Sequence, residues 1–172
     1  MKNEGLSGCC AAMLFVALSV GAAPVWAEPL AKIDGEARCA VCGMFVAKYP
    51  NWVTHIRDSK GHAKIFDGVK DLMAFYFDPG AFGSDGKLAV AEIWVKDYYT
   101  LAWLDGRKAF YVVGSDVYGP MGEEFIPFQD QGAAENFLKD HHGSKLLTFS
   151  EITREMVKSM RSRYKMQAPV MK

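Results

Sequence analysis

The chain has 172 residues, and its 20 basic and 20 acidic side chains give a formal net charge of zero. Half of the residues are hydrophobic, which is enough for one domain or for two small halves that share a core. Because the chain has neither a basic run nor a net positive charge, nucleic acid is not an expected partner.

The first 27 residues have the pattern of a secretory signal. Lys2 precedes an apolar run at 11–23, and Val25-Trp26-Ala27 supplies the small residues that predict cleavage after Ala27. Removal of 27 residues from the 172 leaves 145. The alternatives are an uncleaved N-terminal anchor and lipidation of Cys9, although a lipobox should follow the apolar run and this one precedes it. Membrane association is expected only if the N-terminus is retained or lipidated.

Hydrophobic periodicity and turn residues divide the first half into short elements. It is predicted to contain, in chain order, a flexible polar lead at 28–38, a strand at 52–58, its hairpin partner at 63–66, a helix at 69–77 and a strand at 88–97. Asp67 is the expected cap of the helix, and Asp78-Pro79-Gly80 ends it.

The same order of elements is expected again in the second half. It is predicted to contain strands at 108–114 and 124–128, a helix from the Asp130 cap to His141, a strand at 145–149, a helix from Ser150 to Tyr164 and a loose tail at 166–172. The expected fold is α+β, with β-β-α-β units at about 39–97 and 107–150 in one domain at 39–150, and a C-terminal helix at 151–165. The repeated order suggests a duplication, with chance similarity as the alternative.

Sulfur donors are concentrated in Cys39-Ala40-Val41-Cys42-Gly43-Met44, and no other cysteine follows residue 27. A disulfide between two cysteines so close in the chain would close only a tiny loop and stabilise the fold little. The pair is therefore better explained by a metal-binding or redox role than by a structural disulfide. Attachment of a c-type haem needs a histidine directly after the second cysteine, and this position is Gly43. A structural zinc site needs four ligands, and the chain after residue 27 lacks a second cysteine pair to complete it. A redox pair and a Cu(I) site with two or three soft donors remain. In an extended segment, Cys42 and Met44 would point the same way, and Gly43 would remove bulk beside a metal.

Other candidate residues are scattered along the chain. Met121 lies in a Gly-Pro-Met-Gly loop without a helix or strand face to serve, whereas Met73 fits the apolar face of its helix and is expected in the core. His55 is an additional candidate ligand. We find no nucleophile elbow, metalloprotease motif or phosphate loop in the sequence, which favours binding and transfer over catalysis.

Four segments together resemble the NosL-type accessory proteins of nitrous oxide reductase, a family of periplasmic copper chaperones. They occur in order over about residues 39–150: Cys42-Gly43-Met44 before the Tyr49-Pro50 turn, Lys64-Ile65-Phe66-Asp67 before a helix with Met73, Val95-Lys96-Asp97-Tyr98 followed by Ala109-Phe110-Tyr111-Val112, and Gly119-Pro120-Met121-Gly122-Glu123-Glu124-Phe125-Ile126-Pro127-Phe128.

The resemblance implies a duplicated β-β-α-β fold and a Cu(I) site formed by Cys42, Met44 and Met121. It implies a periplasmic chaperone, not an enzyme, that delivers copper to nitrous oxide reductase or its assembly machinery, or to a related copper enzyme. Many members are lipoproteins, whereas this chain is predicted to be freely secreted. The role of Cys39 stays open between extra ligand, redox partner of Cys42 and neither. The alternative function is a thiol–disulfide oxidoreductase that uses Cys39 and Cys42.

Overall fold

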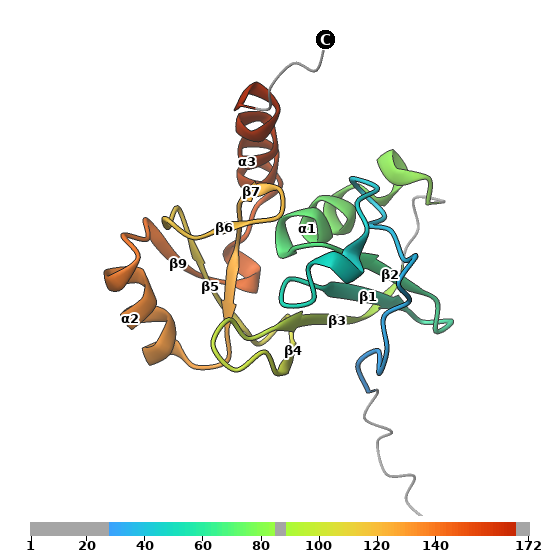
Figure 1. The fold of residues 1–172 in the computed structure, drawn as a ribbon, viewed down its shortest axis with the longest axis horizontal. Helices are drawn as coiled ribbons and strands as arrows, with labels where there is room; N and C mark the ends of the chain where they lie inside the picture. The colour runs from blue at the N-terminus through green and yellow to red at the C-terminus, as the bar shows by residue number, and fades with distance from the viewer. Residues whose placement is uncertain (1–27, 85–88, 168–172) are drawn as a thin grey trace, which may run out of the picture.

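The computed structural model describes residues 28–84 and 89–167, so the predicted export signal, the start of the strand predicted at 88 and the end of the tail lie outside the described residues. As expected, the fold is α+β: two antiparallel sheets lie side by side, each with a helix, and the C-terminal helix projects from the body (Figure 1). None of the helices within these ranges is long and apolar enough to cross a membrane.

The first sheet is built around its first strand. Its members, in the spatial order β2-β1-β3-β4, are β2 (Ala63–Phe66), β1 (Thr54–Asp58), β3 (Val90–Lys96) and β4 (Trp103–Asp105). Helix α1 (Val69–Phe77) has the predicted bounds and joins β2 to β3. Because successive strand residues face opposite sides, buried Ile56 faces the main core and its neighbour His55 faces away. The sequence analysis missed β4.

The second sheet repeats this arrangement. Its order is β8-β5-β9, formed by β5 (Phe110–Val113), β8 (Ile126–Phe128) and β9 (Lys145–Thr148). Helix α2 (Gln131–Asp140) joins β8 to β9, and the Asp130 carboxylate caps it as predicted by accepting from the Ala133 N–H at 2.9 Å. In each sheet the first strand, β1 or β5, lies between the strand that precedes the helix and the strand that follows it. An origin by duplication stays a prediction.

Several elements join or extend the two sheets. They are the 3-10 turns η1 (Val46–Lys48), η2 (Pro79–Phe82) and η3 (Phe149–Glu151), the hairpin β6 (Tyr118–Gly119) and β7 (Gly122–Glu123), and helix α3 (Arg154–Gln167). The expected start of the last helix at Ser150 is wrong. The Glu151 carboxylate accepts from the Thr148 N–H at 2.7 Å and from its hydroxyl at 2.8 Å, which closes a separate single turn before α3 begins.

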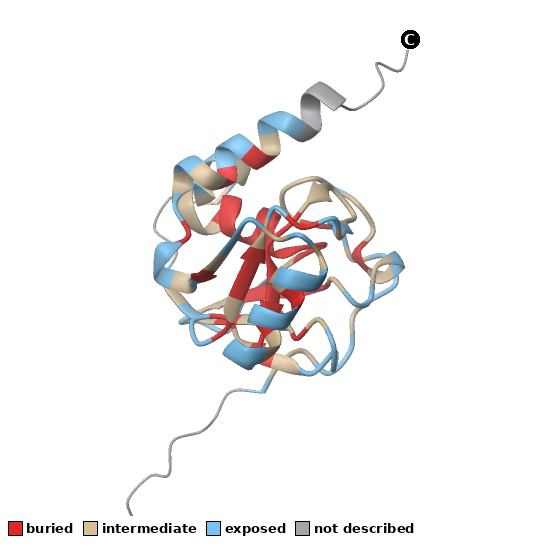
Figure 2. Cartoon of the chain, turned by 90° about the vertical axis from the view of Figure 1, so that its left-hand side faces the viewer, coloured by how far each residue is buried: buried red, intermediate tan, exposed pale blue. Residues whose placement is uncertain are grey.

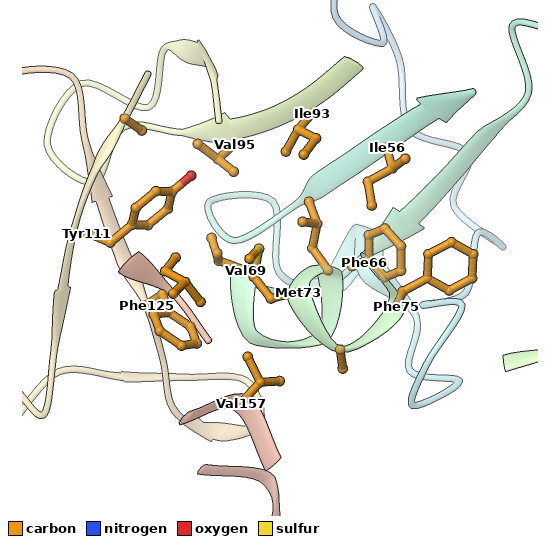
Figure 3. Close-up of a cluster of buried hydrophobic side chains, with 14 of the residues drawn as sticks. Ile56, Phe66, Val69, Met73, Phe75, Ile93, Val95, Tyr111, Phe125 and Val157 are labelled. Atoms are coloured by element: carbon orange, nitrogen blue, oxygen red, sulfur yellow. The ribbon is translucent and has the colours of Figure 1, made fainter. Parts of the chain in front are cut away.

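The main core spans both halves of the chain. Met73, fully buried on α1 as predicted, packs with residues from the first sheet, from the second half and from α3, among them Ile93, Tyr111 and Val157 (Figure 3). The Tyr111 hydroxyl also donates to the Gly106 carbonyl at 2.6 Å. A smaller core lies beneath α2, whose outer face is exposed while the central strands are buried (Figure 2).

The first turn of α1 is capped from the other half of the chain. The predicted cap by Asp67 is wrong: Gly68 is the N-cap residue and has no side chain to offer. The buried Glu124 carboxylate instead accepts from the backbone N–H of Lys70 and, at 3.0 Å, from that of Phe125. A Cβ built on Gly68 would overlap Glu124 Oε2. Glycine is therefore required here because a distant carboxylate occupies the space of a local cap.

We expect Gly68→Ala to destabilise the protein by about 1–3 kcal/mol, the usual cost of forcing an extra carbon into a packed site. Gly35→Ala is the matched control, because a Cβ at position 35 meets nothing within 4 Å. Urea unfolding of both variants measures the difference. Equal shifts of the two midpoints would contradict the cap assignment.

Glu124 should also make stability depend on pH. Burial raises its pKa from the ordinary 4.5 to about 8, with Lys70 opposing this rise and Asp71 adding to it. The folded protein then keeps a proton that the unfolded chain loses. The free energy of unfolding should therefore fall as pH rises from 4.5 to 8, by up to about 1.4 kcal/mol per pH unit. Urea titrations at several pH values should show a flatter profile for Glu124→Gln, and parallel profiles would refute this.

Candidate metal centre

The cysteines lie on a closed loop between Arg38 and Phe45, which form an isolated antiparallel bridge. The Cys39 N–H donates to the Met44 carbonyl at 2.8 Å, and the Gly43 N–H donates to the Cys39 carbonyl at 3.0 Å. Gly43 has φ +79°, so the expected extended path from Cys42 to Met44 is wrong. A Cβ on Gly43 would meet nothing within 4 Å, so the left-handed turn, and not lack of space, explains this glycine.

The loop presents its two thiols unequally. The Ala40 N–H donates to the Ile65 carbonyl at 3.0 Å, which attaches the loop to the end of β2. Cys39 is 3% exposed and belongs to the main core, whereas Cys42 is only half-buried. Both are free thiols. A ligand or a partner therefore reaches Cys42 more easily than Cys39.

Two carboxylates complete a group of four donors. One donor atom each from Cys39, Cys42, Asp67 and Asp71 lies within 4.8 Å of all the others. Cys42 Sγ is 3.3 Å from Asp67 Oδ2, and Cys39 Sγ is 3.5 Å from Asp71 Oδ2. The sequence analysis missed these aspartates as site residues. The available signal was their spacing of four at the start of a predicted helix, which places both on one face.

The surroundings of Cys42 favour the protonated form of its thiol. A hydrogen bond with Cys39 and then burial raise the pKa of the Cys42 thiol well above its usual range. Burial also raises the pKa of Asp71, although Arg161 Nη1, 2.6 Å from Asp71 Oδ1, opposes this. Asp67 Oδ1 is buried without a hydrogen-bond partner among the described residues. A bound cation would satisfy this oxygen and would displace the thiol protons.

The donor set has two metal preferences. Thiolates are soft donors that select Cu(I), whereas two thiolates with two carboxylates also match the four-coordinate sites of Zn²⁺. The raised pKa of Cys42 disfavours a thiolate nucleophile, which argues against a redox enzyme. The loop also leads into the 3-10 turn η1, whereas a thioredoxin-like pair opens a longer helix.

The remaining predicted ligands have separate places in the fold. Met44 is half-buried at the end of the loop, and Met121 is half-buried in the turn between β6 and β7. His55 is fully buried with its ring near Trp94 and Trp103, and burial lowers its pKa to about 4. The structure thus brings Cys39 and Cys42 together, while His55 is not part of the four-donor group. The ligand roles of all five residues stay predictions.

The protein thus has an α+β fold that carries a compact cluster of two thiols and two carboxylates, side chains of the kinds that bind metal ions. The family model that matches residues 29–157 is NosL, and the chain belongs to that family.

The chain is similar to one curated protein and to two solved structures. The copper-binding lipoprotein NosL of Stutzerimonas stutzeri is 27% identical over 143 residues, which cover 78% of this chain and 71% of the relative. The crystal structure of the copper chaperone NosL from Shewanella denitrificans is 30% identical, with a TM-score of 0.61 over 72% of this chain and 95% of that one. The solution structure of apo-NosL from Achromobacter cycloclastes is 28% identical, with a TM-score of 0.46 over 60% of this chain and 87% of that one.

The proximity of the two thiols predicts a redox gate. Mild oxidation should join Cys39 to Cys42 and block Cu(I) binding, because a disulfide sulfur is no longer a thiolate ligand. Reduction should restore binding. Cys39→Ser should keep most of the Cu(I) affinity and lose the sensitivity to oxidant, since only Cys42 remains. Competition against a chromophoric Cu(I) chelator, before and after oxidant, measures both effects, and equal sensitivity of the two proteins would rule the gate out.

Proposed function

We propose that the exported chain is a periplasmic metallochaperone that carries Cu(I) on Cys42, Met44 and Met121 and delivers it during assembly of nitrous oxide reductase or a related copper enzyme. The observation that carries the proposal is the pair of adjacent thiols, one accessible and one buried, beside two buried carboxylates. The copper-binding names of the relatives support it. Copper is the cargo of this protein and not a resident cofactor.

Loading would couple Cu(I) binding to proton release. Because its environment raises the pKa of the Cys42 thiol, Cu(I) binding would displace a proton from this sulfur, which lies 3.3 Å from Asp67 Oδ2. The thioether ligands Met44 and Met121 carry no proton and add no charge. A site with one thiolate and two thioethers would therefore hold Cu(I) with few donors, which leaves room for ligands of a partner.

Release would proceed by ligand exchange at the accessible side. Cys42 is half-buried, so a partner thiolate or thioether can approach the metal there without unfolding the core. Cys39 is buried and linked to Asp71, so it is placed to act as a supporting thiol. A stepwise exchange of this kind needs no catalytic acid or base from the protein.

Cys42→Ser should weaken Cu(I) binding by roughly two orders of magnitude, because a hydroxyl replaces a soft thiolate ligand. Met44→Leu and Met121→Leu should each weaken it less, whereas Met73→Leu is the matched control because Met73 is buried in the core. The measurement is anaerobic competition between the reduced protein and a chromophoric Cu(I) chelator. Cys42→Ser binding as tightly as the unchanged protein would show that the site is wrongly assigned.

Two further arms of that experiment test specificity and delivery. Zn²⁺ added in excess should leave Cu(I) on the protein if Cu(I) uses the sulfur donors, and loss of Cu(I) would assign the cluster to Zn²⁺. Incubation of the loaded protein with copper-free nitrous oxide reductase tests the recipient. Binding without transfer would refute that recipient and leave the copper site standing. Insulin reduction abolished by Cys39→Ser would favour the oxidoreductase instead.

A further inference from the structure

We infer that Lys70 is a positioning residue that holds the Met121 turn against the start of α1 and so keeps the Met121 thioether available to the copper cargo. The inference rests on the proposed function, because it takes Met121 as a copper ligand. This one buried lysine would join the turn that carries Met121 to the part of the chain that contacts Cys39 and Cys42.

Three hydrogen bonds of Lys70 connect the two segments at this junction. Its ammonium Nζ lies 2.5 Å from the Met121 carbonyl and 2.7 Å from the Glu123 carbonyl. Its backbone N–H donates to the Glu124 carboxylate. Lys70, in the first turn of α1, therefore donates hydrogen bonds to the turn that carries Met121 and to the residues that follow it.

The other side of the same helical turn holds the thiols. Asp71 follows Lys70 directly and contacts Cys39 Sγ, and Asp67 contacts Cys42 Sγ. The start of α1, together with Asp67 just before it, is thus attached to the cysteine loop through two aspartates and to the Met121 turn through Lys70. A shift of either segment relative to the other must break contacts made by this part of the chain.

A lysine is an unfavourable residue at this position unless its contacts matter. Lys70 is 1% exposed, so its charge has been removed from bulk water. It also lies at the N-terminus of a helix, where the helix dipole disfavours a positive charge. An apolar side chain of similar length would fill the space without these costs. An ammonium group has three donors, so the Lys70 Nζ can bind both backbone carbonyls from one point.

The β6–β7 hairpin is also held by α3. Arg163 on α3 binds the Glu123 carboxylate with Nε and Nη2, the latter at 2.5 Å from Oε2. Gly122, next to Met121, has φ +81°. Strand β7 is therefore fixed by α3, while Lys70 fixes the carbonyl of Met121 itself.

The first test follows the methionine methyl groups by NMR during titration with Cu(I). In the unchanged protein, the Met44 and Met121 methyl signals should both shift. In Lys70→Met the Met121 shift should be lost and the Met44 shift retained, because Met44 belongs to the cysteine loop. Met73 is the internal reference for the core. Equal loss at Met44 and Met121 would indicate general damage, and full retention at Met121 would overturn the inference.

The second test is a double-mutant cycle on Cu(I) affinity. Met121→Leu should lower the affinity by about tenfold in the unchanged protein and by less than about twofold in Lys70→Met, because residues in one network are not additive. Lys64→Met is the matched control, since Lys64 is an exposed lysine on β2, and there the full effect of Met121→Leu should persist. Independent effects of the Lys70 and Met121 changes would refute positioning.

Two outcomes separate this inference from the proposed function. If the protein binds Cu(I) through Cys42 but Met121→Leu has no effect, the inference fails while the copper site stands. If the unchanged protein binds no Cu(I), both fail.

Should Lys70→Met not fold, as thermal unfolding would show, Lys70→Gln replaces it, because a shorter amide keeps donors but cannot reach both carbonyls. Glu124→Gln should keep the Met121 shift, since it leaves the ammonium contacts in place.

Discussion

Burial of charge around the first turn of α1 is the constraint on which the site depends. Asp67, Lys70, Asp71 and Glu124 are all at most 3% exposed, and charges removed from water are tolerated only when they are neutralised, paired or hydrogen-bonded. Their partners come from four separate parts of the chain: the cysteine loop, the β6–β7 hairpin, the segment that leads into β8, and α3. Because these four parts supply the hydrogen-bond and ion-pair partners of the buried charged groups, those groups fix the positions of the four parts relative to one another.

Local patterns in the sequence predicted the elements and the two cysteines of the site, but not the aspartates that lie beside them. The α1 bounds, the Asp130 cap and most strands follow from periodicity and capping residues, which act over a few positions. The pairs between Cys39 and Asp71 and between Cys42 and Asp67 join residues 32 and 25 positions apart, which no local pattern encodes. Asp67 was expected to cap α1 because its type and place suit that role. Glu124 took the role because Gly68 leaves space for a carboxylate from the other half.

The unequal burial of the two thiols suits a protein that must hold a metal and give it up. A site enclosed on all sides would bind strongly and exchange slowly, whereas an open pair of thiols would oxidise readily outside the cytoplasm. Here Cys39 lies in the core beside Asp71, and Cys42 remains accessible on a loop whose path is set by Gly43. Asp67 Oδ1 is buried without a hydrogen-bond partner among the described residues, and a bound cation would satisfy it. Carboxylates are hard donors that bind Cu(I) more weakly than sulfur ligands do, so the two aspartates need not slow the release of Cu(I).

In the proposed copper site the donors are divided between the two halves of the chain, which would couple copper binding to the packing of the halves. The thiols and Met44 belong to the first half, and Met121 belongs to the second. The main core and the contacts of Lys70 and Glu124 are what bring these segments together. A cargo that bridges both segments binds the packed state better than a loosened one, and it therefore stabilises that packing by mass action. By the same linkage, a partner that separates the Met121 turn from α1 would lower the affinity for copper without touching the metal.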